Sequence, residues 1–128
     1  MTVTINGAHV VMYSGEAEAD REFLRDVLGF AHVDAGHGWL IFALPPAEAA
    51  VHPLESGTGK TSGKLGAELY LMCEDLKATM KELEGKGVKF GAVTKERWGI
   101  RTTIGLPSGG EIGLYEPKHK TAIGRKVE

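Results

Sequence analysis

The amino-acid sequence predicts an α+β fold made of two tandem β-α-β-β-β modules. Two stretches carry apolar residues at helical spacing, and each follows one run of β-forming residues and precedes three more. A stretch rich in Gly, Ser and Lys, residues 55–66, separates the two halves. We therefore expect a single domain over residues 1–128, with module 1 at about 5–54, a linker at about 55–65, module 2 at about 66–117 and a tail at 118–128.

Module 1 opens with the alternating run AHVVMYS, which is typical of a strand. The helix follows in GEAEADREFLRDVLGF, and Gly29 suits the C-terminal cap of this helix. Its apolar stripe consists of Phe23, Leu24, Val27 and Leu28. The runs FAHVDA and GWLIFAL, separated by Gly36 and Gly38, predict two short strands, and AEAAVHP predicts the last strand of the module.

Module 2 repeats this order. AELYLMC predicts a strand, and EDLKATMKELEGKG predicts a helix with Leu76, Met80 and Leu83 on one side. VKFGAVT, WGIRTTIGL and EIGLYEP then predict three strands, the last two joined by the turn PSGG. The letters repeat as well, because LPPAEAAVHP beside LPSGGEIGLYEP aligns Glu48 with Glu111 and His52 with Tyr115.

Composition limits the classes of function. The net charge of -2 gives no basic face for nucleic acid, and no apolar run reaches the ~20 residues of a membrane span. The first residues show no secretory signal, so we expect a cytoplasmic protein. The letters GKT in residues 59–61 do not make a phosphate-binding loop, because Leu54 stands where the leading Gly is needed and a strand follows where a helix should start.

The ordered set of these segments resembles the vicinal oxygen chelate superfamily, which includes glyoxalase I, extradiol dioxygenases and the bleomycin and fosfomycin resistance proteins. The resemblance runs from AHVVMYSGEAEADREFLRDVLGF, through EDLKATMKELEGKGVKF, to WGIRTTIGLPSGGEIGLYEP. It implies that the two modules form a curved eight-stranded cup with the helices on the outside. It also implies a small-molecule site between the modules, with a divalent metal at its floor in many members.

The resemblance implies three metal ligands. His9 stands at the head of the first strand, Glu68 takes the equivalent place in module 2, and His52 falls near the end of the last strand of module 1. Each also has a structural interpretation, as a half-buried His or a solvent-facing Glu. Two His and one carboxylate would suit Fe, Mn, Ni or Zn.

The fourth ligand position departs from the pattern of the family. The Glu of metal-dependent members falls on Gly113, which has no ligand atom. Glu111 lies two residues away on the same side of the strand, as a substitute ligand or an acid/base group. Alternatively, Gly113 leaves room for a bound molecule that hydrogen-bonds to Glu111.

Two functions follow. One is a metal-dependent small-molecule enzyme of the glyoxalase or extradiol dioxygenase type, with Glu111 as its catalytic residue. The other is a metal-free, drug-sequestering protein of the bleomycin-resistance kind, which needs no cofactor. In both, we expect Trp39, Tyr70, Trp98, Gly113 and Tyr115 to form the pocket for a small-molecule ligand, although aromatic residues in strands are commonly plain core.

Two further expectations complete the sequence-based description. His32, His37 and His119 lie at or near turns and the tail, and we expect all three to be exposed. A homodimer is expected because a two-module cup leaves sheet edges that this family often closes by pairing or swapping modules between chains.

Overall fold

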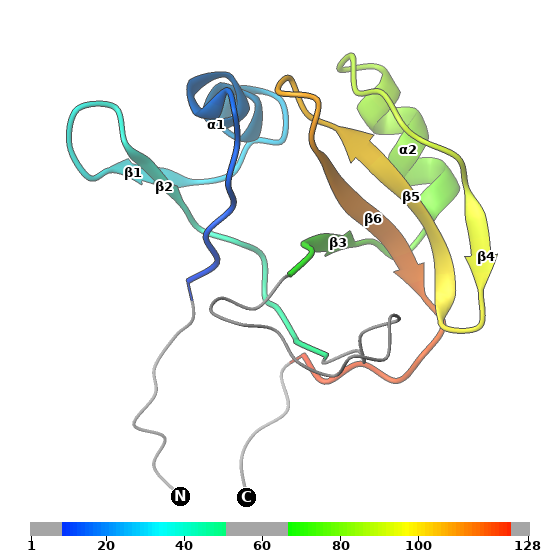
Figure 1. Cartoon of the computed structure of the whole chain (residues 1–128). Helices are drawn as coiled ribbons and strands as arrows, with labels where there is room; N and C mark the ends of the chain where they lie inside the picture. Colours follow the sequence, from blue (N-terminus) through cyan, green and yellow to red (C-terminus); the bar gives the residue numbers. More distant parts are fainter. Residues whose placement is uncertain (1–8, 51–66, 124–128) are drawn as a thin grey trace, which may run out of the picture.

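The structure is a computed structural model that describes residues 9–50 and 67–123. Its helices and strands follow one another along the chain as shown in Figure 1. They are α1 (Ala17–Asp26), β1 (His32–Asp34), β2 (Leu40–Phe42), β3 (Tyr70–Met72), α2 (Leu76–Glu84), β4 (Thr94–Glu96), β5 (Gly99–Gly105) and β6 (Glu111–Pro117).

Module 2 forms one four-stranded sheet in the order β3-β6-β5-β4. The pairs β4–β5 and β5–β6 are antiparallel, whereas β3 runs parallel to β6. This confirms the predicted β-α-β-β-β order. The strand expected in VKFGAVT is only partly formed, because Phe90 makes an isolated bridge to Ile104 and regular pairing starts at Thr94.

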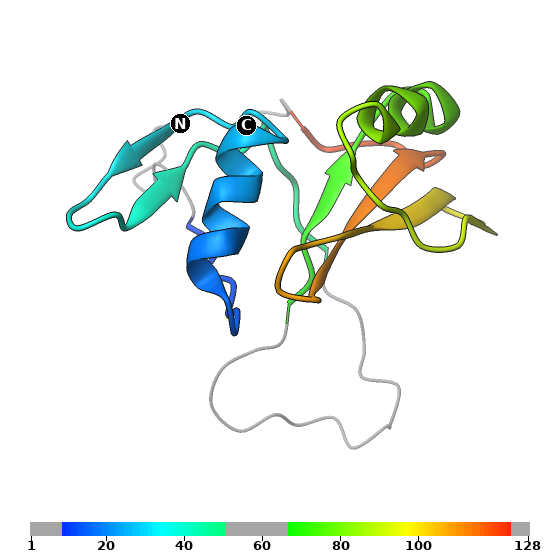
Figure 2. The ribbon, with the colours of Figure 1, turned by 90° about the horizontal axis from the view of Figure 1, so that it is seen from above.

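One face of this sheet is covered by α2 (Figures 1 and 2). Each core side chain is at most 5% exposed, and the core residues come from α2, the segment after it, β5 and β6. The core residues are Leu76, Val88, Ile104, Ile112 and Leu114. Because strand side chains alternate, burying Ile112 and Leu114 on this face turns Gly113 and Tyr115 to the opposite face.

Two carboxylates satisfy backbone N–H groups at the start of α2. Asp75 is the N-cap and accepts a hydrogen bond from the Ala78 N–H at 3.0 Å. Glu116, on β6, accepts one from the Leu76 N–H at 2.9 Å. Glu116 also forms an ion pair with Lys118, and these contacts, that with Lys118 first, hold the pKa of Glu116 below its usual range. The first turn of α2 is therefore fastened to the last strand of the sheet.

Module 1 contributes α1 and the short antiparallel hairpin β1–β2. Gly29 follows α1 in the left-handed region, with φ 73°, and the Phe30 N–H donates to the Leu24 carbonyl at 3.0 Å, as expected for a glycine helix cap. The first expected strand is not formed, because residues 9–14 carry no strand pairing. Six strands in two sheets are present in the described residues, so the eight-stranded cup is not confirmed; the three-residue edges of β1 and β2 offer little backbone for a further strand to pair with.

The helix α1 lies between the hairpin and the four-stranded sheet (Figure 2). Three residues of its predicted apolar stripe, Phe23, Val27 and Leu28, pack against the core of module 2. The buried Asp20 adds a polar contact, since its carboxylate accepts from the Ser14 hydroxyl at 2.7 Å and from the Ser108 N–H at 3.0 Å. The first helix is thereby joined to the turn between β5 and β6.

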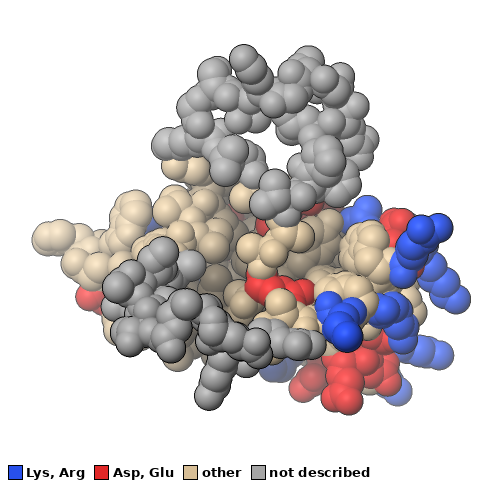
Figure 3. Space-filling model, turned by 90° about the horizontal axis from the view of Figure 1, so that it is seen from below, with Lys and Arg blue, Asp and Glu red and all other residues tan. Residues whose placement is uncertain are grey.

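The surface of the described residues is mixed in charge. Seen from below, Lys and Arg side chains alternate with Asp and Glu on one flank, and the flank of the hairpin is mainly uncharged (Figure 3). No helix in the described part of the chain is both long and apolar enough to cross a membrane.

Candidate functional site

The sheet face opposite α2 carries a cluster of aromatic side chains. Tyr70 on β3 and Tyr115 on β6 come from neighbouring strands, and Trp98 lies in the turn between β4 and β5. The three rings meet edge to face, with centroids 5.7 Å apart for Tyr70 and Tyr115, 5.2 Å for Trp98 and Tyr115, and 6.2 Å for Tyr70 and Trp98. We call this surface, with Gly113 and Arg101, the aromatic face.

Gly113 is the residue that lets the Tyr70 ring lie where it does. The two are register partners in the parallel pair β3–β6. A Cβ at position 113 would stand 2.8 Å from the Cγ of Tyr70 and still closer to Cδ1 and Cε1, whereas real Cβ atoms essentially never approach within 3.0 Å. Any side chain at 113 would therefore displace the ring.

Gly99 plays a similar part for Tyr115. A Cβ on Gly99 would lie 3.2 Å from Tyr115 Cδ2 and 2.6 Å from the Glu116 carbonyl oxygen. Gly113 and Gly99 thus leave the space that the rings of Tyr70 and Tyr115 occupy.

A polar edge borders the rings on the side of β4 and β5. The Arg101 guanidinium donates to the Tyr70 hydroxyl oxygen at 3.4 Å and lies 3.6 Å from the Glu96 carboxylate. The Tyr70 hydroxyl in turn donates to Glu68 at 3.4 Å. The face therefore offers a cationic group with more N–H donors than its contacts with described residues use, beside an apolar surface.

The opposite edge is formed by the chain after β6. The His119 ring stacks on Tyr115 with centroids 6.0 Å apart, and its Nε2 lies 3.1 Å from the Tyr115 hydroxyl and 3.8 Å from the Glu48 carboxylate. Glu48 also accepts from the Ala122 N–H at 2.6 Å, and the Lys118 N–H donates to the Trp98 carbonyl at 2.8 Å. Burial, followed by the charges of Glu48 and Tyr70, raises the pKa of Tyr115, so this phenol keeps its proton at neutral pH.

The predicted metal ligands are distributed differently. Glu68 is exposed, precedes β3 by two residues and lies beside the Tyr70 hydroxyl. His9 is exposed and outside regular secondary structure, and His52 lies outside the described residues. Glu111 begins β6, is exposed, and accepts a hydrogen bond from the Thr103 hydroxyl at 3.3 Å. Within the described residues, no three side chains among His, Cys, Asp and Glu come together in a way that could hold a metal ion.

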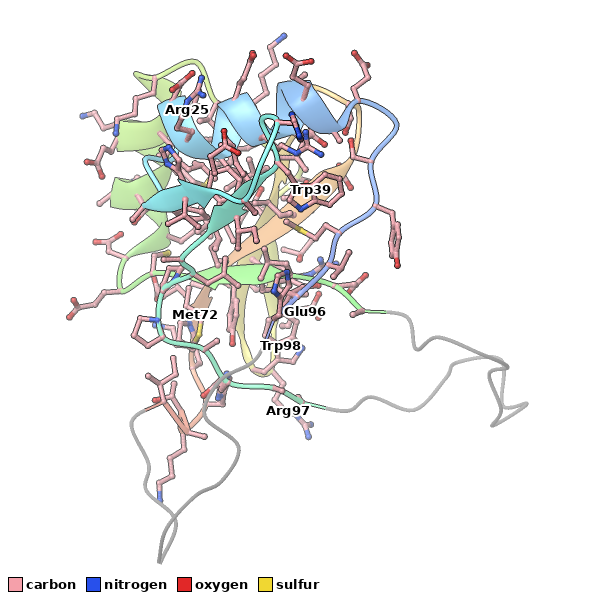
Figure 4. All side chains as sticks on the ribbon, turned by 90° about the vertical axis from the view of Figure 1, so that its left-hand side faces the viewer. Arg25, Trp39, Met72, Glu96, Arg97 and Trp98 are labelled. Atoms are coloured by element: carbon pink, nitrogen blue, oxygen red, sulfur yellow. The ribbon has the colours of Figure 1, made fainter. Side chains whose placement is uncertain are left out.

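Four of the five predicted pocket residues lie together on the aromatic face, namely Tyr70, Trp98, Gly113 and Tyr115. Trp39 lies elsewhere. It is 60% exposed beside α1, with the Arg21 guanidinium 4.7 Å from its ring centroid. Figure 4 shows it well apart from Trp98, which lies near Glu96 at the β4–β5 turn.

Two shallow hollows lie away from this face. One is at the start of α1, between Glu16 and Glu22. The other lies where Phe23 meets the turns around Gly87 and Leu106. Neither gathers several aromatic or nucleophilic side chains, so the aromatic face is the better candidate, as an open surface rather than an enclosed cavity.

The comparison with protein families agrees with this architecture. The sequence model of the glyoxalase/bleomycin resistance protein/dioxygenase superfamily matches residues 7–118. The chain belongs to this superfamily. Its members bind small molecules, often with a divalent metal, and often form dimers. No curated protein is similar enough in sequence to match.

Several solved structures of the superfamily share the fold. The antibiotic-binding protein TnmS3 from Streptomyces sp. CB03234 is 22% identical, with a TM-score of 0.61 over 91% of this chain and 100% of its own. A superfamily member from Sphaerobacter thermophilus DSM 20745 is 24% identical, with a TM-score of 0.55 over 89% and 99%. A lactoylglutathione lyase from Agrobacterium tumefaciens is 14% identical, with a TM-score of 0.50 over 89% and 96%. At these identities the likeness shows the shared fold.

The described residues do not fit a metal ion at the floor of the sheet. Position 113, where the resemblance placed a carboxylate ligand, has no ligand atom, and the space above it is filled by the Tyr70 ring. The carboxylate of Glu68, another predicted ligand, accepts a hydrogen bond from the hydroxyl of the same tyrosine. Tyr70 and a side-chain ligand at 113 therefore compete for one volume.

Sequence reasoning missed several residues of this site, among them Arg101, His119 and Glu48. His119 was expected to be exposed, and this was wrong: its side chain is 31% exposed and stacks on Tyr115. Glu48 was noted only as the repeat partner of Glu111, yet it contacts His119 across more than 70 positions of sequence. The spacing of four residues between Tyr115 and His119 was the only signal in the sequence, and it is weak because Pro117 lies between them and rules out a regular helix.

Proposed function

We propose that this protein binds a planar aromatic small molecule on the aromatic face without using a metal ion. The observation that carries the proposal is the Tyr70 ring lying over Gly113. This ring occupies the space that a metal-binding side chain at position 113 would need. The centroids of the Trp98 and Tyr115 rings lie within 6.2 Å of its own. Rings presented edge to face leave apolar area on which a flat ligand can stack.

Arg101 supplies the polar part of recognition. Its guanidinium is one-third exposed and is held beside Tyr70 by Glu96. A ligand carbonyl or carboxylate would find planar N–H donors there. TnmS3, which shares the fold, is an antibiotic-binding protein, and sequestration rather than turnover is the function that needs only these groups.

The test is equilibrium binding of a planar aromatic carboxylate, anthraquinone-2-carboxylate, by calorimetry in the presence and absence of EDTA. We expect the same affinity in both, and a loss of roughly three- to tenfold in Trp98→Ala, because one aromatic contact is removed. Val33→Ala, an exposed change on the hairpin, is the matched control. Unchanged affinity in both Trp98→Ala and Tyr70→Ala would show that the ligand binds elsewhere.

The metal-dependent enzyme predicted from the sequence needs His9, His52 and Glu68 to converge. Metal analysis of protein purified without a His-tag, before and after His9→Ala, decides this alternative. Stoichiometric Fe, Mn, Ni or Zn that is lost in His9→Ala would overturn the metal-free proposal.

We also propose that the protein acts as a homodimer. An open aromatic face contacts only one side of a ligand, and residues 10–13 expose apolar side chains without forming a strand. A second copy could cover both surfaces.

A further inference from the structure

The His119 ring makes hydrogen bonds through both of its nitrogens. Its Nδ1 lies 2.8 Å from the Lys120 carbonyl oxygen, which can only accept a hydrogen bond. Nδ1 therefore carries the hydrogen, and in the neutral imidazole Nε2 is the acceptor. The partner of Nε2, the Tyr115 hydroxyl at 3.1 Å, must then donate its proton to His119.

This arrangement leaves the Tyr115 oxygen with lone pairs but without a free proton. The same holds for Tyr70, whose hydroxyl donates to Glu68 and accepts from Arg101. Next to neutral His119, both tyrosine oxygens can only accept from a ligand.

We propose that His119 is a specificity-determining residue that, in its neutral form, makes the aromatic face select planar ligands with an O–H or N–H donor, such as phenols. The inference rests on the proposed function, because it names the ligand chemistry of the same site. His119 acts as a positioning residue, through the Tyr115 hydroxyl.

Two side chains of the described residues face the His119 ring, Tyr115 from β6 and Glu48 from the chain after β2. Lys118 and Lys120 flank His119 in the sequence; Lys118 is paired with Glu116, and Lys120 offers its backbone carbonyl to Nδ1.

The first measurement needs no ligand. Nitrogen-15 NMR of the wild-type imidazoles at about pH 8.5, with His119 assigned from His119→Gln, should show the Nδ1–H tautomer for this ring. Tyr115→Phe should shift His119 towards a mixture of tautomers, since Nε2 loses its donor. An Nε2–H tautomer in the wild type would overturn the proposal.

The second measurement compares 2-naphthol with 2-methoxynaphthalene, which differ only in the O–H donor. We expect 2-naphthol to bind the wild type about fivefold more tightly at about pH 8.5, because it makes one additional neutral hydrogen bond. His119→Gln keeps a neutral acceptor and should hold this preference. His119→Phe keeps a stacked ring but frees the Tyr115 proton, so its preference should be near unity.

The outcomes separate the two proposals. If both probes bind but the wild type shows no preference, or if His119→Phe behaves as the wild type, the role of His119 is overturned and the aromatic site stands. If neither probe binds, the proposed function is overturned, and the ligand preference with it.

Discussion

Gly113 is the residue on which the character of the site depends. Its missing side chain is a requirement of the neighbouring strand rather than a gap in a ligand set, because Tyr70 occupies the space. The sequence showed the departure from the metal-binding pattern and left two interpretations open, a substitute role for Glu111 or room at Gly113 for a bound molecule. The register of β3 against β6, which no local pattern specifies, puts the Tyr70 ring in the space beside Gly113, which neither interpretation anticipated.

Gly113→Ala should lower the free energy of unfolding by about 1–3 kcal/mol, because the new Cβ overlaps the Tyr70 ring. Urea denaturation measures this. The double variant Gly113→Ala/Tyr70→Ala is the control, since removing the ring removes the clash. If the cost of Gly113→Ala is the same in the Tyr70→Ala background, the ring is not its cause.

Glu116 should make stability depend on pH. Its contacts with Lys118 and the Leu76 N–H lower the folded-state pKa, so the stabilisation is complete above the ordinary glutamate pKa of about 4.3 and is lost as the pH falls through the lower, folded-state value. Thermal unfolding of the wild type and of Glu116→Gln between about pH 3 and 7 should show the two curves converging at the acid end. Parallel curves would contradict this linkage.

At the scale of elements, the helices were predictable and the short strands were only partly so. The stripes in residues 15–30 and 74–87 gave both helices, because apolar periodicity is a local signal. The β1–β2 hairpin was visible from Gly36 and Gly38, both of which have positive φ. The run at residues 8–14 has strand composition, but its described part, residues 9–14, has no strand pairing, since pairing depends on a partner elsewhere in the chain.

Asp20→Ala should loosen α1 from the β5–β6 turn. Two hydrogen bonds to a buried carboxylate are lost and the Ser108 N–H is left unpaired, so the expected cost is about 1–3 kcal/mol in urea denaturation. Glu18→Ala, an exposed change in the same helical turn, is the matched control. Equal effects of the two substitutions would show that the contact of Asp20 with Ser108 contributes nothing specific.

At the scale of the whole molecule, the described chain presents one open sheet face and one exposed apolar segment. Val10, Val11 and Met12 are between 44% and 61% exposed, although their composition is that of a buried strand. The sequence predicted the two-module architecture but could not show which surfaces are left uncovered in one chain, because burial depends on contacts between distant segments.

Light scattering at micromolar concentration should therefore give the mass of a dimer. Val11→Asp should shift the protein towards the monomer, because a charge at an apolar interface is costly to bury. Val93→Asp, at an equally exposed position on module 2, is the control. A monomeric wild type at this concentration would contradict the homodimer.

The parallel pairing of β3 with β6 also constrains the order in which the chain folds. β3 is the first strand of module 2 to be synthesised, but its partner is the last, about 40 residues later. Non-local strand pairs form only after a long loop has closed. The Tyr70 ring therefore cannot pack against Gly113 until β6 has been synthesised and has left the ribosome. The stacking surface is therefore among the last parts of the molecule to be assembled, and a nascent chain that ends before β6 should hold α2 without any site for a ligand.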